Sequence, residues 1–135
     1  MTAFFDTNIF IYAVSTSPED ATKRGVALKL IEDSEIHLSL QVIQEFLHTC
    51  LRKSRIGLNS TAVEDAARWL LAFRCQIPDG ASVMKALETR KTYGISYWDA
   101  AIVVSAAALG CDTLYSEDLN HGQIYNGVRV ENPFL

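Results

Sequence analysis

Long apolar runs are scarce in this chain of 135 residues, and their scarcity argues against a membrane protein. The longest strongly apolar stretch, 100–109, includes Ser105 and is well short of the roughly 20 residues that a membrane span needs. The first residues carry no basic segment, and Asp6 and Asn8 interrupt any apolar signal core. We therefore expect a cytoplasmic protein that does not enter the membrane.

Cysteine is also scarce, and its arrangement argues against two further classes. The three cysteines, Cys50, Cys75 and Cys111, are odd in number and widely spaced. Neither a disulfide framework nor a zinc motif has this pattern. We expect three buried, reduced thiols, which agrees with a cytoplasmic location.

Basic residues are outnumbered, with 12 Lys and Arg against 16 Asp and Glu, giving a formal net charge of −4. This balance disfavours a protein that grips nucleic acid by bulk electrostatics, because such domains usually carry a basic surface. A local basic strip or a metal-assisted site stays open. Hydrophobic residues make up 49% and charged residues 21%, an ordinary globular composition. The length favours one domain over residues 1–135.

Short apolar segments alternate with amphipathic ones along the chain. The pattern predicts strands at 2–5, 37–40, 75–77, 114–116 and 128–130, and helices at 8–14, 18–32, 41–55, 61–73, 81–93 and 97–109. Ser17, Ser60 and Ser96 are the expected helix caps, and 117–127 is expected to be a loop or short helix. Strands that alternate with helices imply an α/β fold with a central parallel sheet and helices on both faces. The helix at 97–109, apolar nearly all round, is expected to be central.

Four acidic residues fall where this topology brings chain segments together. Asp6 ends the first strand, and Asp118 follows a late one. Asp99 is in the first turn of the central helix, and Glu45 lies on the polar face of the helix after the second strand. Ligands of open α/β sheets bind outside the carboxyl ends of the strands. The sequence therefore predicts four carboxylates on one edge.

A cluster of this kind needs compensation. Two carboxylates about 4 Å apart repel by roughly 4 kcal/mol at an effective dielectric constant of 20. Either some carboxyl groups take up protons, or a divalent cation joins them, with magnesium or manganese preferred by oxygen ligands. Each acid singly also fits a cap, a turn or a solvated helix face. Their convergence favours the metal site.

The motifs that contain these acids are FFDTNI, S-x5-EF, SYWDA and LYSED, in chain order. The ordered set resembles the four acidic motifs of PIN-domain ribonucleases, and most of all those of VapC-type toxins. The resemblance implies an Mg²⁺- or Mn²⁺-dependent endoribonuclease. It also implies a cognate antitoxin partner and a homodimer.

Carried over by position, the resemblance makes Asp6, Glu45, Asp99 and Asp118 the catalytic and metal-binding residues. Asp6 and Asp99 would bind the metal most directly, and the other two would complete its water shell or orient the attacking water. Asn8 and Ser116 match polar positions that support the acids by hydrogen bonds. In the fourth motif the spacing favours Asp118 over Glu117, so Glu117 is expected to be solvated.

An acidic protein needs some local means of holding RNA. Arg52, Lys53 and Arg55 cluster at the end of the helix that contains Glu45, and Arg52 is the best candidate for a phosphate contact. The pairs 23–24 and 90–91 are further basic candidates. His48 and His121 each follow an acid of the set by three residues, and both are expected to be structural or solvated.

Two other functions remain open from the sequence. One is a catalytically silent PIN fold that binds RNA or protein, which would require a mispositioned or blocked site. The other is a receiver-like phospho-acceptor domain, which also pairs an α/β fold with carboxylate-bound magnesium. A receiver domain expects a lysine after a late strand, where this chain has Ser116, Glu117 and Asp118.

Overall fold

The computed structural model describes residues 2–52 and 56–135 and contains a single twisted sheet. Its strands lie in the order β3-β2-β1-β4-β6-β5. They span Thr2–Phe5 (β1), Glu35–Ser39 (β2), Arg74–Gln76 (β3), Thr113–Tyr115 (β4), Ile124–Tyr125 (β5) and Val128–Glu131 (β6). The predicted α/β class with a central parallel sheet is confirmed.

The central strand β1 pairs in parallel with β2 on one side and with β4 on the other. Phe5, the last residue of β1, is opposite Tyr115, the last residue of β4. Because the two strands end in register, the residues that follow them leave the sheet at the same edge. One strand was not predicted: β5, inside 117–127, pairs antiparallel with β6 at the end of the sheet.

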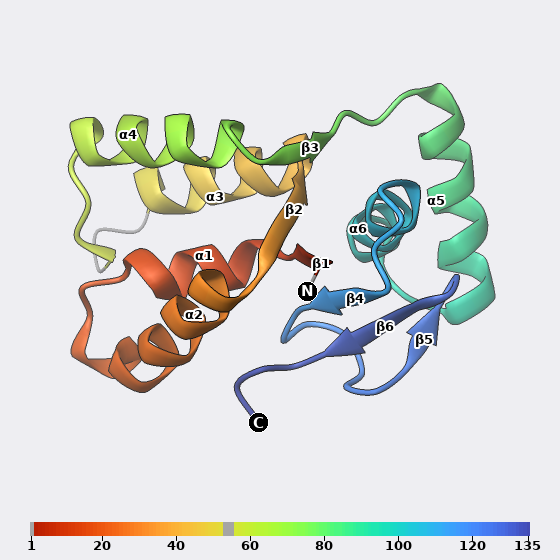
Figure 1. Cartoon of the computed structure of the whole chain (residues 1–135). Coiled ribbons are helices and arrows are strands. Elements are labelled where there is room, and N and C mark those ends of the chain that lie inside the picture. Colours follow the sequence, from red (N-terminus) through yellow and green to blue (C-terminus); the bar gives the residue numbers. More distant parts are fainter. Residues whose placement is uncertain (1, 53–55) are drawn as a thin grey trace.

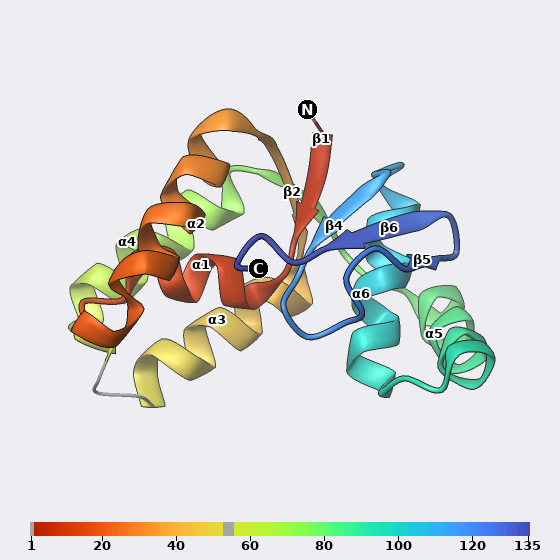
Figure 2. The ribbon, with the colours of Figure 1, turned by 90° about the horizontal axis from the view of Figure 1, so that it is seen from below.

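Helices cover both faces of the sheet, as predicted. They span Thr7–Val14 (α1), Ala21–Asp33 (α2), Leu40–Arg52 (α3), Ser60–Leu71 (α4), Gly80–Tyr93 (α5) and Tyr97–Ala108 (α6), with a 3₁₀ turn at Pro18–Asp20. Figure 1 shows α1 to α4 on one side of the sheet and α5 and α6 on the other. In Figure 2, turned by 90°, the two layers flank the strands again. The predicted end of the 41–55 helix falls at 53–55, outside the described residues.

Capping residues set where several helices begin. Ser96 accepts a hydrogen bond from the Asp99 N–H, as predicted, so α6 begins at a side-chain cap. The other two predicted caps are not confirmed as such. Ser17 stands at the N-cap position, before Pro18, but it precedes a 3₁₀ turn and its side chain makes no capping hydrogen bond. Asn59, not Ser60, caps α4 by accepting from the Ala62 N–H; asparagine and serine cap equally well, so adjacent candidates compete.

The core lies between the sheet and the helices and is built from aliphatic and aromatic side chains. Phe4, Phe5 and Leu114 of the central strands are fully buried. Helix α6, with Val103 fully buried, packs between the sheet and α5, which confirms its central place. The three cysteines are free thiols, but only two are buried: Cys75, in the edge strand β3, is partly exposed. No helix within the described residues is long and apolar enough to cross a membrane.

Candidate metal centre

Asp6 occupies the centre of the candidate site, directly after β1. Only 4% of the residue is exposed. Its N–H donates to the Tyr115 carbonyl, and its carboxylate accepts from the Thr7 N–H at 2.7 Å and from the Ser116 hydroxyl at 2.7 Å. Asp6 also caps α1 through the Thr7 contact. Its carboxylate is therefore fixed at the junction of β1, α1 and β4.

Glu45 reaches the same place from α3. Its carboxylate accepts from the Thr7 hydroxyl at 3.0 Å and from the Gln41 amide at 2.7 Å. The Gln41 amide also donates to the Trp98 carbonyl at 3.2 Å, which ties α3 to the start of α6. A glutamate that sequence reasoning placed on a polar helix face is thus oriented by hydrogen bonds from two segments.

Asp99 and Asp118 complete the set from the other side of the sheet and from the loop after β4. Asp99 is partly buried in the first turn of α6. Asp118 accepts from the Asn8 amide at 3.1 Å, and its N–H donates to the Ser116 hydroxyl. Asn8 and Ser116 therefore hold Asp118 and Asp6 by hydrogen bonds, in the places the motif resemblance implied.

The four carboxylates influence one another electrostatically. Burial, reinforced by the charges of Asp118 and Glu45, raises the pKa of Asp6 from 3.8 to about 7 despite two hydrogen bonds that lower it. Partial desolvation and the Glu45 charge raise the pKa of Asp99. Asp118 is an exposed residue, yet partial desolvation of its carboxyl and the Asp99 charge raise its pKa as well. The predicted convergence of the four acids is therefore present.

The donor chemistry of this cluster fits a divalent cation. Four carboxylates are hard oxygen ligands, which select magnesium or manganese. The buried Asn8 Oδ1 atom has no hydrogen-bond partner among the described residues, so the site also holds a neutral oxygen without a donor. Within residues 2–52 and 56–135, no group of three or more His, Cys, Asp or Glu side chains is arranged so that it could hold a metal ion. The oxygen donors are thus gathered near one another but are not arranged to enclose an ion.

A surface cavity of about 320 Å³ opens beside the acids. Its lining combines acids of the cluster with neutral polar and aromatic groups: Thr7, Asn8, Ile11, Tyr12, Glu45, His48, Thr49, Glu117 and Asp118. Glu45 and Asp118 therefore face a space that is open to solvent and to a ligand, while Asp6 and Asp99 are not part of its lining. His48, which sequence reasoning treated as structural or solvated, is exposed and lines this space.

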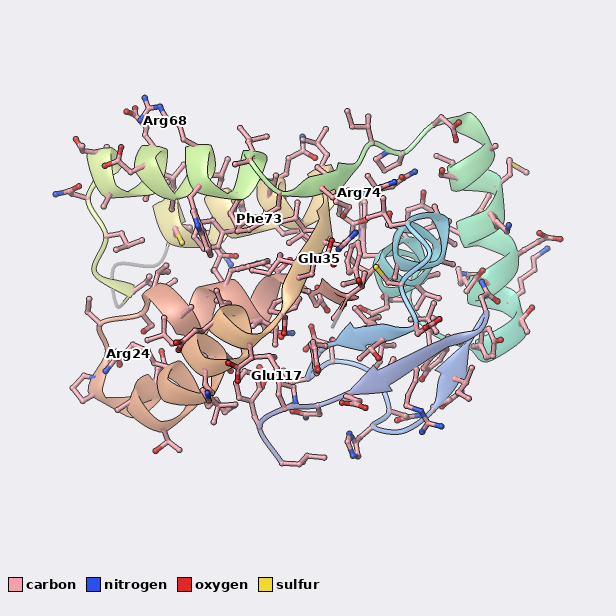
Figure 3. The ribbon with its side chains drawn as sticks, in the orientation of Figure 1. Arg24, Glu35, Arg68, Phe73, Arg74 and Glu117 are labelled. Atoms are coloured by element: carbon pink, nitrogen blue, oxygen red, sulfur yellow. The ribbon has the colours of Figure 1, made fainter. Side chains whose placement is uncertain are left out.

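Glu117 is not a solvated side chain, which corrects the expectation from sequence. It accepts from the Tyr12 hydroxyl at 2.6 Å and from the Lys23 ammonium at 3.0 Å. Figure 3 shows it beside α2, the helix that contains Lys23 and Arg24. The Lys23 ammonium also lies 4.6 Å from the centre of the Tyr12 ring. These contacts bind the loop that carries Asp118 to α1 and α2.

The candidate phosphate-binding residues fall into different situations. Lys23 pairs with Glu117, and the Arg24 guanidinium donates to the Ser15 carbonyl, so both have structural partners. Arg52 is exposed in the last turn of α3, while Lys53 and Arg55 lie outside the described residues. Arg90 and Lys91 are exposed at the end of α5. His121 is structural as expected, because its Nδ1 accepts from the Asn132 N–H.

The fold is an α/β sheet with acidic residues gathered at the carboxyl ends of β1 and β4. Residues 3–126 match the family model of the PIN domain, and the chain belongs to that family. This match excludes the receiver-like alternative. No curated protein matches the sequence significantly.

Several solved structures share the fold at low sequence identity. VapC20 of Mycobacterium tuberculosis, a toxin that cleaves the sarcin-ricin loop, is 19% identical over 94% of this chain and 98% of its own, with a TM-score of 0.72. A toxin–antitoxin complex from Klebsiella pneumoniae is 19% identical over 97% of both chains, with a TM-score of 0.70. VapBC2 of Rickettsia felis, bound to promoter DNA, is 18% identical over 98% of both chains, with a TM-score of 0.67.

Proposed function

We propose that this PIN domain, spanning residues 1–135, is an endoribonuclease that hydrolyses RNA phosphodiester bonds with the help of Mg²⁺ or Mn²⁺. The proposal places it in the cytoplasm. The observation that carries it is that acids from the residue after β1, from α3, from the start of α6 and from the loop after β4 lie close enough for neighbouring carboxylate charges to raise the pKa values of Asp6, Asp99 and Asp118. Crowded carboxylates are costly for a fold to keep without a cation, and a cation at such a site is suited to phosphoryl chemistry.

Asp6 and Asp99 are the proposed direct ligands, and Glu45 and Asp118 are proposed to complete the water shell or orient the attacking water. A bound divalent cation supplies an activated water and stabilises negative charge on the scissile phosphate. The residues around it set the geometry. Ser116 and the Thr7 N–H hold the Asp6 carboxylate, while the Thr7 hydroxyl and Gln41 hold that of Glu45.

The nuclease proposal is tested by RNA cleavage with magnesium, with manganese and with a chelator. We expect Asp6→Asn and Asp99→Asn each to lose about 100-fold or more of the activity, as sites do when charge stabilisation is removed. Asp65→Asn is the matched control, since Asp65 is exposed and pairs with Arg68 on the outer surface of α4. Equal cleavage by all variants would overturn the assignment. RNA binding without cleavage by the wild type would instead support the silent PIN fold.

A role as the toxin of a toxin–antitoxin pair extends the proposal. It is supported by the motif resemblance and by the fold shared with toxin–antitoxin structures from Klebsiella pneumoniae and Rickettsia felis. On this proposal the chain has a cognate antitoxin and forms a homodimer. Expression of the wild type should arrest bacterial growth, and expression of Asp6→Asn at the same level should not. Growth arrest by both the wild type and Asp6→Asn would show that toxicity does not depend on the acidic site.

A further inference from the structure

A second surface cavity adjoins the acidic cluster, and the proposed chemistry leaves it without a role. Its volume is about 530 Å³, and it is lined by Gln41, Gln44, Glu45, His48 and Trp98. Two of these residues, Glu45 and His48, also line the cavity that contains Asn8 and Asp118. The two cavities are therefore neighbours on either side of the Glu45 helix face, and whatever occupies the second lies next to the acids.

Trp98 is the unusual member of this cavity, because 64% of it is exposed. It immediately precedes Asp99 at the start of α6. Its backbone is tied to α3, because the Trp98 carbonyl accepts from the Gln41 amide, and its ring packs edge-on against Tyr97 with centroids 5.2 Å apart. A large aromatic ring that is anchored but uncovered, one residue from a proposed metal ligand, is suited to bind a planar group.

We propose that this cavity holds an unpaired nucleobase of the RNA strand, stacked on the Trp98 indole beside the scissile phosphate. The inference rests on the proposed ribonuclease function and adds a binding subsite to it. Gln44 and His48 are one turn apart on α3, and their side chains can donate to or accept from the edge of the stacked base. The occupant is a base because the cavity combines an aromatic face with polar amide and imidazole groups and shares Glu45 with the acidic cluster.

Stacking would also explain how a chain with a net charge of −4 can bind RNA, which is itself a polyanion. Base–aromatic stacking needs no positive charge and works with every base. Lys23 and Arg24 are engaged with Glu117 and Ser15. Affinity would then come from base faces and the bound cation more than from a basic surface.

The test is binding of a short single-stranded RNA, with magnesium, to full-length protein in an Asp6→Asn background that leaves the RNA intact. Trp69→Phe makes Trp98 the sole indole, since the chain has two tryptophans. We expect RNA to quench Trp98 fluorescence. We expect Trp98→Leu to weaken binding about 10-fold, the scale of one stacked base, and Trp98→Phe to restore most of it. Trp69→Phe alone should leave affinity unchanged.

The outcomes separate the subsite from the nuclease function. Equal affinity of Trp98→Leu and Trp98→Phe, absence of quenching, or equal affinity for an abasic oligonucleotide overturns the subsite, while wild-type cleavage keeps the nuclease proposal. Quenching and a stacking-dependent loss in a wild type that does not cleave support the subsite and overturn the nuclease proposal. Dissociation of a dimer by Trp98→Leu without loss of RNA affinity assigns this face to a second copy and overturns the inference.

Discussion

The buried Asp6 carboxyl makes this fold less stable as the pH rises, and Asp6→Asn should remove that effect. The folded pKa is about 7 against 3.8 for an ordinary aspartate. Between these values the folded chain keeps the proton that the unfolded chain has lost. The stabilisation is thus fully present below about pH 4 and is lost as the pH rises through 7.

The size of the effect follows from the two pKa values. A shift of about three units corresponds to about 4 kcal/mol of unfolding free energy above pH 7. Within an accessible window, the same shift costs the wild type about 2 to 3 kcal/mol between pH 5 and pH 8. Asparagine cannot ionise and is close to aspartate in shape. The stability of Asp6→Asn relative to the wild type should therefore rise by that amount over the window.

Urea unfolding at several pH values, in a chelator to keep the site free of metal, measures the difference. Asp99 titrates in both proteins, whereas the charge of Asp6 is coupled to those of Asp118 and Glu45, so the difference reports Asp6 together with this coupling. Asp65→Asn, an exposed change, serves as the control and should run parallel to the wild type at all pH values. Parallel curves for Asp6→Asn and the wild type would refute the electrostatic account of the site.

Three further effects can be measured by melting or denaturant titration. Magnesium at about 100 times its dissociation constant should stabilise the wild type by about 2.7 kcal/mol and Asp99→Asn by less; an equal gain in both would argue against Asp99 as a ligand. Ser116→Ala removes a donor to the Asp6 carboxylate and should cost about 2 kcal/mol, more above pH 7 than below pH 4; a loss independent of pH would contradict this. Both Gly57 and Gly110 have positive φ, so replacing either with alanine should destabilise the fold, in the case of Gly110→Ala by about 1 kcal/mol. Gly57→Ala should cost more, because only there would the new methyl group meet a threonine hydroxyl, at 2.1 Å. Equal losses would show that the hydroxyl moves away freely.

The sequence was sufficient for those parts of the site that depend on strand ends and helix periodicity. Asp6 follows a buried apolar strand, and Asp99 lies in a capped first turn, so the parallel topology alone brings them to one edge. The partners of Glu117 could not be read in the same way. Tyr12 and Lys23 are 105 and 94 residues away in the sequence, and only the packing of α1 and α2 brings them to the loop.

Strand β5 was also not predicted, although the sequence next to it contains a turn motif that could have indicated it. Asn126 and Gly127 both have positive φ and join β5 to β6. An Asn-Gly pair between short apolar segments is typical of a tight hairpin turn. Because β5 has only two residues, it is too short to show the alternation of polar and apolar residues by which a strand is recognised. The helix caps show a similar limit, because Asn59 and Ser60 are adjacent and equally able to cap.

The pairing of β1 with β4 has a consequence for the order of events during synthesis. Asp6 is made early, but the groups that enclose it, the Tyr115 carbonyl and the Ser116 hydroxyl, follow about 110 residues later. At a typical rate of about 5 to 20 residues per second, the nascent chain waits some seconds for them. Until then Asp6 is an ordinary solvated aspartate. The acidic cluster thus comes into being only when β4 has paired with β1, so a nascent chain that ends before β4 cannot possess it.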